Sequence, residues 1–357
     1  FAVVRGRSLV LLETVFGPKP LLTLSGMLRG MFIAKPGCRL VSSDFSAIEG
    51  VVIAAIAGEQ WRMEVFAGHG KIYEMSAAKI LGIPFEEMME YRRVHGKHHP
   101  GRQSPGKVAE LGLGFGGWIN AWKQFNGPGT DDEIKDNIVA WRAASPAIVY
   151  LWGGQKLRGD LYAVRQQARG LPVDPGVGQW GVQELYGLEG AFIRAVLEPD
   201  QWHEVERLDG KATGVAYCKH GEAVYCRLPS GRFITYHNVQ MTDTGTWRGL
   251  SLSFEGYNTN PKNGPIGWIR INTYAGRLAE NVVQAVARDI QMHAIRNCER
   301  NGYPVVMHTY DEIVAEVPIG TGSVEELEAL MADLPRWAKG WPIKAAGGWE
   351  RNRYCKA

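Results

Sequence analysis

The segment Cys38-Arg-Leu-Val-Ser-Ser-Asp-Phe-Ser-Ala-Ile-Glu49 combines an apolar run, an aspartate and the start of a helical pattern. The apolar residues before Asp44 are typical of a strand. Ser46 and Glu49 have capping-box spacing, so we expect a helix that begins at Ser46 and continues to about Ala57. The pattern therefore places a carboxylate where a strand meets a helix. Such a position suits a metal ligand and also an ordinary turn residue.

A second pair of carboxylates lies in the distant segment Tyr303-Pro-Val-Val-Met-His-Thr-Tyr-Asp-Glu-Ile-Val-Ala-Glu-Val-Pro318. Two β-rich arms, residues 305–308 and 313–317, predict a hairpin with Asp311 and Glu312 near its tip. An ordinary hairpin with a polar turn is the alternative. Acids between strands this apolar are costly unless they are solvated or bound to cations. Together with Asp44 they suit two Mg²⁺ ions roughly 3.5–4 Å apart, one activating a nucleophilic oxygen and one stabilising a leaving oxygen.

The composition is that of a large, mildly basic globular chain. Its 357 residues are 45% hydrophobic, enough for a large core and two or three subdomains. The net charge of +3 means that any nucleic-acid surface must come from local clustering of cations. Five cysteines without CxxC pairing predict reduced thiols rather than a zinc site. Without a long apolar run or a signal-peptide pattern, we expect a soluble intracellular protein and no membrane partner, and the initial Phe1 suggests a fragment.

A basic stretch lies between Tyr91 and Ala109, with five Lys or Arg residues, three His and no acid. Both a solvated loop and a phosphate-facing surface fit this composition. At its end, Lys107, Leu111 and Phe115 follow one another at helical spacing on one face. A cation, an aliphatic group and an aromatic ring in a row suit the phosphates, sugar and base of a nucleoside triphosphate. An amphipathic helix loosened by glycines is the alternative.

A long helix is predicted from about Tyr274 to Arg300, and Arg277, Asn281 and Gln284 share one of its faces. These polar side chains either lie along a bound ligand or form a solvent-facing stripe. The remaining patterns predict further elements, which we give as ranges. They are a strand over 28–34, helices over 71–82, 85–93, 131–169, 179–197 and 323–334, and strands over 215–218, 223–228 and 342–354.

The motifs SSDFSAIE, GKVAELGLGFGG, ENVVQAVARD and HTYDEIV occur in this order in the chain. In this combination they resemble the polymerase region of family A DNA polymerases, and most of all their bacteriophage branch. The resemblance covers roughly Leu21 to the C-terminus. It implies an α+β right-hand fold with an antiparallel palm sheet, mainly helical fingers and a thumb that is mostly missing. The implied parts are a thumb or linker remnant over 1–20, palm over 21–65 and 270–357, and fingers with a long insertion over 66–269.

The resemblance also implies roles for single residues. Asp44 and Asp311 are similar to the metal-binding catalytic carboxylates, helped by the carbonyl of Phe45 and possible auxiliary Glu312. Glu49 is similar to the residue that bars a ribose 2′-hydroxyl. The remaining implied contacts are with the nucleotide and the DNA: Lys107, Leu111, Phe115 and Arg102 for the dNTP, and Arg277, Asn281, Gln284 and His308 for primer–template. Arg232 stands in a predicted turn between strands, where it either contacts a nucleic-acid backbone or is merely exposed.

Several positions depart from the family pattern. Arg102 stands five residues before Lys107 rather than one helical turn before it. Leu111 stands where an aromatic residue is commoner. Tyr310 replaces the histidine that usually precedes the hairpin aspartate.

The implied reaction is template-directed addition of dNTPs to a primer 3′-hydroxyl with two Mg²⁺ ions, for which Mn²⁺ can substitute. We expect a monomer that acts in phage DNA replication in the host cytoplasm. One alternative is an enzyme like the single-subunit RNA polymerases, against which Glu49 argues because a ribonucleotide enzyme leaves space for the 2′-hydroxyl. Another is a catalytically silent primer–template binding module, against which the intact Asp44, Asp311 and Lys107 argue.

Overall fold

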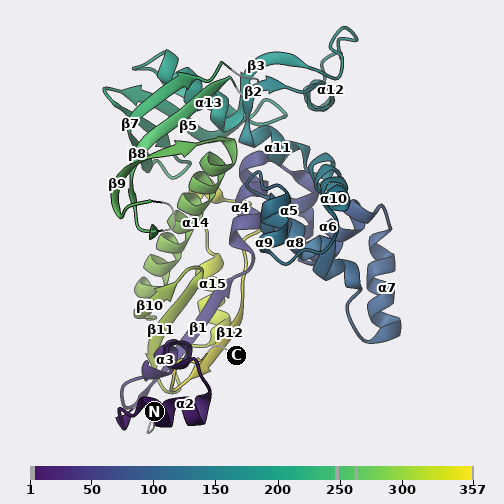
Figure 1. Ribbon diagram of the computed structural model, residues 1–357. Helices are drawn as coiled ribbons and strands as arrows, with labels where there is room; N and C mark the ends of the chain where they lie inside the picture. The colour runs from purple at the N-terminus through teal and green to yellow at the C-terminus, as the bar shows by residue number, and fades with distance from the viewer. Residues whose placement is uncertain (1–4, 246–248, 262–263, 356–357) are drawn as a thin grey trace. The chain divides into compact units, whose positions relative to one another are not determined.

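The computed structural model describes residues 5–245, 249–261 and 264–355 (Figure 1). It confirms the predicted α+β class with antiparallel sheets. The chain forms two compact units. Unit 1 consists of Phe1–Ser46, Ile290–Pro335 and Ile343–Ala357, and unit 2 consists of Ala47–Asp289 and Arg336–Pro342. The division into palm, fingers and thumb remains a prediction.

Unit 1 is built on a four-stranded antiparallel sheet with the order β10-β11-β1-β12. The strands are β1 (Cys38–Phe45), β10 (Val305–Thr309), β11 (Glu312–Pro318) and β12 (Ala345–Arg351). The structure therefore confirms the predicted hairpin and closing strand. Because β1 is central, its side chains are almost all buried, including Val41 and Phe45. Helix α15 (Val324–Ala332) packs on this sheet, and Ser323 caps it through a hydrogen bond from the backbone N–H of Glu326.

The predicted strand over 28–34 is wrong. The segment before β1 forms α2 (Leu9–Phe16), α3 (Pro20–Leu28) and the 3-10 turn η1 (Arg29–Met31). Leucine and methionine favour a helix, and Pro20 at the first position of α3 suits a helix start. Only Ile33 makes a bridge, to Arg353, so the extended part is too short to be a strand.

Unit 2 begins with a group of helices. The predicted helices over 71–82 and 85–93 are confirmed as α6 (Ile72–Leu81) and α7 (Phe85–His95). The other helices of this group are α4 (Ile48–Ala57), α5 (Gln60–Ala67), α8 (Val108–Leu113), α9 (Ile119–Gln124), α10 (Asp131–Ala144) and α11 (Pro146–Trp152). The helix after Asp44 begins at Ile48, and its N-cap is Ala47 in a left-handed conformation without a side-chain hydrogen bond. The predicted capping box of Ser46 and Glu49 is therefore wrong.

The helices predicted over 131–169 and 179–197 are interrupted. After α11 the chain forms β2 (Gly154–Leu157), α12 (Gly159–Ala168) and β3 (Val182–Tyr186), and then α13 (Gly187–Leu197). Strands β2 and β3 pair in a two-stranded sheet. Glycines allow this arrangement. Gly187 has a positive φ of 60°, and a Cβ atom there would lie 2.4 Å from the carbonyl oxygen of Tyr150. Helical periodicity does not register such a close backbone approach.

A six-stranded antiparallel meander follows, whereas the resemblance implied mainly helical fingers. Its strands are β4 (His203–Glu206), β5 (Ala212–His220), β6 (Ala223–Arg227), β7 (Phe233–Asp243), β8 (Leu250–Asn258) and β9 (Gly267–Thr273), in sequential order. The predicted strands over 215–218 and 223–228 lie within β5 and β6. Helix α13 covers one face, where Phe192 packs against Tyr217 and Tyr236. Helix α14 (Ala275–Arg300) comes next and confirms the long predicted helix.

A buried ion pair fixes α8 within unit 2. Arg62 of α5 is only 2% exposed and donates to the carboxylate of Glu110 on α8 and to the hydroxyl of Ser145. The indole N–H of Trp141 donates to the other oxygen of Glu110 at 2.9 Å. Each charge is thus paired inside the protein, because an isolated buried charge is costly. No helix in the described part of the chain is long and apolar enough to cross a membrane.

We predict that Arg62→Met lowers the free energy of unfolding by about 3–5 kcal/mol, because Glu110 keeps a buried charge without its cation. The double variant Arg62→Met/Glu110→Gln should recover most of this loss, since the amide oxygen still accepts from Trp141. Urea unfolding followed by circular dichroism measures both. Equal losses in the two variants would show that packing, rather than charge, dominates here.

Candidate active site

The pairing of β1 with β11 brings together carboxylates that are far apart in the sequence. Asp44 is opposite Glu312 in the antiparallel register, and the backbone N–H of Phe45 donates to the carbonyl oxygen of Asp311 at 3.1 Å. Asp44 and Asp311 are both half-buried, so their side chains keep some access to solvent. The structure therefore places the two predicted catalytic aspartates at the same end of neighbouring strands in unit 1.

Glu312 differs sharply from its neighbour Asp311. It is 1% exposed and accepts hydrogen bonds from the hydroxyl of Ser42, at 2.8 Å, and from the hydroxyl of Tyr354. Burial, followed by this bond to Glu312, raises the pKa of Tyr354 to about 12. The phenol thus remains a donor at neutral pH. Glu312 is held inside the sheet as a structural acceptor, which leaves the half-buried Asp44 and Asp311 as the accessible acids of this strand end.

A side chain of α14 holds the hairpin tip within unit 1. The amide nitrogen of Gln291 donates to the carbonyl oxygen of Tyr310 and, at 3.5 Å, to that of Glu312. These two carbonyls flank Asp311. Tyr310 has a φ of 53°, which is uncommon for a residue with a side chain, and its ring is 91% exposed. Gln291 therefore fixes the turn that presents Asp311.

The donor set at this strand end fits Mg²⁺. Mg²⁺ is usually held by one or two carboxylates, with waters and substrate phosphates completing six oxygen ligands. Asp44 and Asp311 supply two such carboxylates, and the strand-end carbonyls are the same hard oxygen type. Among the described residues, no group of three or more His, Cys, Asp and Glu side chains could form a closed metal cage. This pattern suits an ion shared with a phosphate substrate, and the ligand role of both residues stays a prediction.

The predicted nucleotide-binding helix forms in part. Lys107 ends the π-helical turn η3 (Gln103–Lys107), and α8 continues from it. Leu111 is one turn further and 46% exposed, whereas Val108, Ala109 and Leu113 are buried. An exposed leucine on this face agrees with a ligand-facing position, and equally with a loose surface helix. Phe115 lies beyond the last residue of α8, so the single helical face predicted for all three side chains is too long.

Phe115 is placed by a close backbone approach instead. A Cβ atom on Gly276, at the start of α14, would lie only 2.1 Å from the carbonyl oxygen of Phe115. Gly116 also has a positive φ of 76° and faces Gly276. The end of α8 thus packs directly on the start of α14 within unit 2. Gly276 was not singled out by the sequence patterns, although a glycine in a helical pattern is a signal of such contact.

Arg102 is held by the protein itself. Its Nε atom donates to the carboxylate of Glu74 at 2.9 Å, and its guanidinium lies 5.3 Å from the ring centre of Tyr73. Glu74 is 4% exposed, and His98 also lies 3.3 Å from its carboxylate. The basic stretch is therefore partly neutralised by this buried acid. A triphosphate contact of Arg102 stays a prediction.

The polar stripe of α14 makes contacts along unit 2. Asn281 donates to the hydroxyl of Tyr236 at 3.2 Å, and Gln284 donates to the carboxylate of Glu49 at 2.7 Å. Glu49 is thus held by another predicted site residue rather than by its own helix start. Arg277 donates to the carbonyl oxygen of Asn272 at 2.8 Å. Each side chain of the stripe therefore already has a hydrogen-bond partner in the protein, and neither alternative predicted for the stripe describes it fully.

The two remaining predicted DNA contacts lie in different surroundings. Arg232, in the turn between β6 and β7, forms an ion pair with Asp289 of α14 and donates to the carbonyl oxygen of Ala285. It thereby ties the turn to the helix. His308 is an exposed residue of β10, opposite Ile313. Binding of DNA by either residue stays a prediction.

We predict that Tyr354→Phe destabilises the protein by about 1–3 kcal/mol at neutral pH, because buried Glu312 loses a donor. The folded-state pKa of Tyr354, about 12, lies above the ordinary value of 10.0. Its contribution is therefore complete below about pH 10 and decreases as the pH rises towards the folded-state value. The stability difference from the parent should thus stay constant up to about pH 10 and narrow between about pH 10 and pH 12 in urea unfolding. Tyr257→Phe, at an exposed ring, is the control, and a constant difference would contradict this role of the phenol.

We also compared the chain with known proteins. No protein-family model matches the chain. The DNA polymerase of Bacillus phage SP02 is 34% identical over 348 residues, which are 97% of this chain and 45% of the phage protein. The POL domain of Pol1 from M. smegmatis, solved in complex with DNA primer-template and dNTP, covers 92% of this chain and 42% of its own, at 15% identity and a TM-score of 0.47. The chain is thus a relative of a bacteriophage DNA polymerase, as its motifs predicted, and spans about half of that protein's length.

Proposed function

We propose that this chain is the polymerase region of a template-directed DNA polymerase, which acts in phage DNA replication. The observation that carries the proposal is the position of Asp44 and Asp311 at one end of β1 and β11, in a chain 34% identical to a phage DNA polymerase. The partners are primer–template DNA and dNTPs.

The reaction joins the primer 3′-oxygen to the α-phosphorus of a dNTP. The hydroxyl passes its proton to a solvent water, a new P–O bond forms, and the bond from the α-phosphorus to the bridging oxygen breaks to release pyrophosphate. Asp44 and Asp311 would hold two Mg²⁺ ions, with the carbonyl of Phe45 as a further ligand. Ions bound there would favour the ionised primer hydroxyl and neutralise charge on the phosphates. Glu312, Ser42 and Tyr354 support the strand end without touching the substrate.

Unit 2 supplies groups that bind the nucleotide. The ammonium of Lys107 neutralises the triphosphate, including the charge that builds up on the leaving pyrophosphate. Leu111 is exposed one turn later and packs against the sugar. Phe115 stacks by the templating base. Arg102 also contacts the phosphates, while it keeps part of its hydrogen bonding to Glu74. Primer–template contacts come from Arg277, Asn281 and Gln284 of α14, and also from Arg232 and His308.

Glu49 selects deoxyribose. Its carboxylate is held by the 2.7 Å hydrogen bond from Gln284, so it does not rotate freely. A fixed side chain that fills the 2′ position excludes a ribose hydroxyl by clash and by loss of hydration. This favours a DNA polymerase over an enzyme like the single-subunit RNA polymerases.

We predict that Asp44→Asn or Asp311→Asn reduces primer extension with Mg²⁺ by at least about a thousandfold, because a charged metal ligand becomes neutral. Binding of primer–template should change little. Glu350→Gln is the matched control: it removes the charge of an acid in the same sheet that is opposite Val41, three residues along β1 from Asp44. Substantial extension by either aspartate variant would reject the two-metal site. Primer–template binding without any extension by the parent chain would favour the silent binding module.

We predict that Glu49→Ala raises incorporation of ribonucleotides relative to dNTPs by about ten- to a hundredfold, because the side chain at the 2′ position is gone. Glu49→Gln keeps nearly the same volume and the bond partner Gln284, so it should keep most of the discrimination. The ratio of kcat/KM for a dNTP and the matching rNTP measures both. An unchanged ratio in folded Glu49→Ala would assign Glu49 to structure alone.

A further inference from the structure

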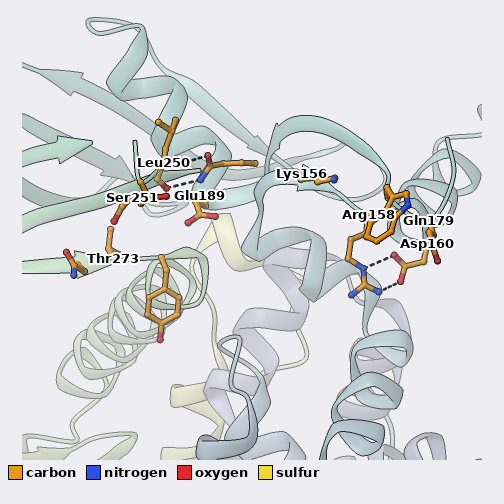
Figure 2. Close-up of a pocket in the computed structure, with 13 residues that line it drawn as sticks. Lys156, Arg158, Asp160, Gln179, Glu189, Leu250, Ser251 and Thr273 are labelled. Carbon is orange, nitrogen blue, oxygen red and sulfur yellow. Dashed lines mark hydrogen bonds and ion pairs between the residues drawn. The ribbon is translucent and has the colours of Figure 1, made fainter. Parts of the chain in front are cut away.

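A large pocket in unit 2 lies outside the residues assigned to the reaction. It has a volume of about 1130 Å³ and is lined by β2 and the long connection of the β2–β3 hairpin, by Glu189 of α13, and by the ends of β8 and β9. Figure 2 shows Thr273 on one side of it and Arg158 on the other, with Lys156 between them. We call it the hairpin pocket. Its size exceeds that of most small-molecule sites, which favours a segment of a longer ligand.

The hairpin pocket combines aromatic rings with cations. Trp180 is 74% exposed and Tyr274 is 53% exposed, so both rings are accessible to a ligand. The ammonium of Lys156 lies 6.0 Å from the ring centre of Trp180. Arg158 lines the same pocket and forms an ion pair with Asp160. Exposed aromatic rings beside cations are the groups that stack bases and contact phosphates in proteins that bind single strands.

A buried hydroxyl provides a second, independent observation. The side chain of Thr273 lines the pocket, is 7% exposed, and its hydroxyl oxygen has no hydrogen-bond partner. Buried polar groups are nearly always paired, so a hydroxyl of this kind is suited to a ligand that supplies the partner. Glu189 lies in the same wall, and burial raises its pKa.

The pocket adjoins the helix that we propose for primer–template contacts. Tyr274 lines the pocket and directly precedes the first residue of α14. The guanidinium of Arg277 lies 5.9 Å from the ring centre of Tyr274. The pocket therefore adjoins Arg277, the first of the α14 residues proposed to contact primer–template.

We propose that the hairpin pocket binds unpaired DNA, namely the single-stranded template that has not yet been copied. Bases stack on Trp180 and Tyr274, Lys156 and Arg158 contact the phosphates, and Thr273 bonds to a base edge. The inference rests on the proposed polymerase function and adds to it a binding site for the template overhang. It assigns a purpose to part of the insertion between α11 and α14.

The test compares two primer–templates that differ only in the unpaired template, with an overhang of one nucleotide or of about twelve. Affinities of the full chain are measured by fluorescence anisotropy at fixed salt, because phosphate contacts depend on salt. The parent should bind the long overhang more tightly. Trp180→Ala/Lys156→Ala should lose at least about fivefold in affinity for the long overhang and change little for the short one, as expected from one lost stacking contact.

Matched variants separate a specific loss from a general one. Trp202→Ala removes another exposed tryptophan of unit 2, which has Arg227 5.0 Å from its ring centre but does not line the pocket. It should bind both substrates like the parent. Trp180→Phe keeps a stacking ring and should restore most of the affinity. Thr273→Val keeps the shape without the hydroxyl, so it should weaken long-overhang binding without lowering stability in urea.

Each outcome has one meaning. A parent chain that neither binds nor extends primer–template rejects the proposed function. A parent that extends primers, while the double variant keeps its preference for the long overhang, rejects only the hairpin pocket as a template site. The same conclusion follows if Trp202→Ala loses as much affinity as the double variant, or if the variants lose dNTP affinity and keep overhang affinity.

Discussion

The antiparallel register of β1 and β11 is the constraint on which the candidate active site depends. It pairs Asp44 with Glu312 and sets Phe45 against Asp311. A shift by one residue would place Asp44 opposite a residue other than Glu312 and would move every side chain of the shifted strand to the opposite face. Both faces of β1 and β11 are buried, so such a shift would force the side chains around Val41 and Ile313 to repack. The apolar core thus determines which carboxylates remain accessible.

The three neighbouring acids Asp44, Asp311 and Glu312 have different surroundings. This difference distinguishes an acid that supports the sheet from acids that remain accessible to a ligand. Glu312 is buried and bonded by Ser42 and Tyr354, so its charge is balanced by hydrogen bonds inside the sheet. Asp44 and Asp311 stay half-buried, where a cation and its water can reach them. A fully buried pair would be costly without a permanent metal, and a fully exposed pair would hold a metal weakly. The half-buried position suits an ion that arrives with its phosphate substrate.

In unit 2, buried contacts fix helix α8 while a neighbouring residue of the same helix stays exposed. Glu110 of α8 is locked by Arg62 and Trp141, while Leu111, the next residue, is exposed. The start of α14 is fixed in turn by the close approach of Gly276 to Phe115. These contacts hold the positions of Lys107 and the α14 stripe without using their polar groups. The same unit carries the hairpin pocket, whose exposed rings and unpaired hydroxyl have no comparable structural use.

The sequence by itself determined the ordered motifs, the hairpin around Asp311 and the long helix of Arg277, Asn281 and Gln284, because these follow from local periodicity and turn residues. The resemblance of the motifs predicted the α+β class and also that Asp44 and Asp311 belong together. Only the tertiary structure decided that Glu312 is buried, that Gln291 holds the hairpin turn, and that Glu49 is bonded to Gln284 rather than to its own helix start. The capping box and the unbroken helix over 131–169 failed for the same reason. Long-range partners and close glycine contacts compete with local propensity, and no local pattern records them.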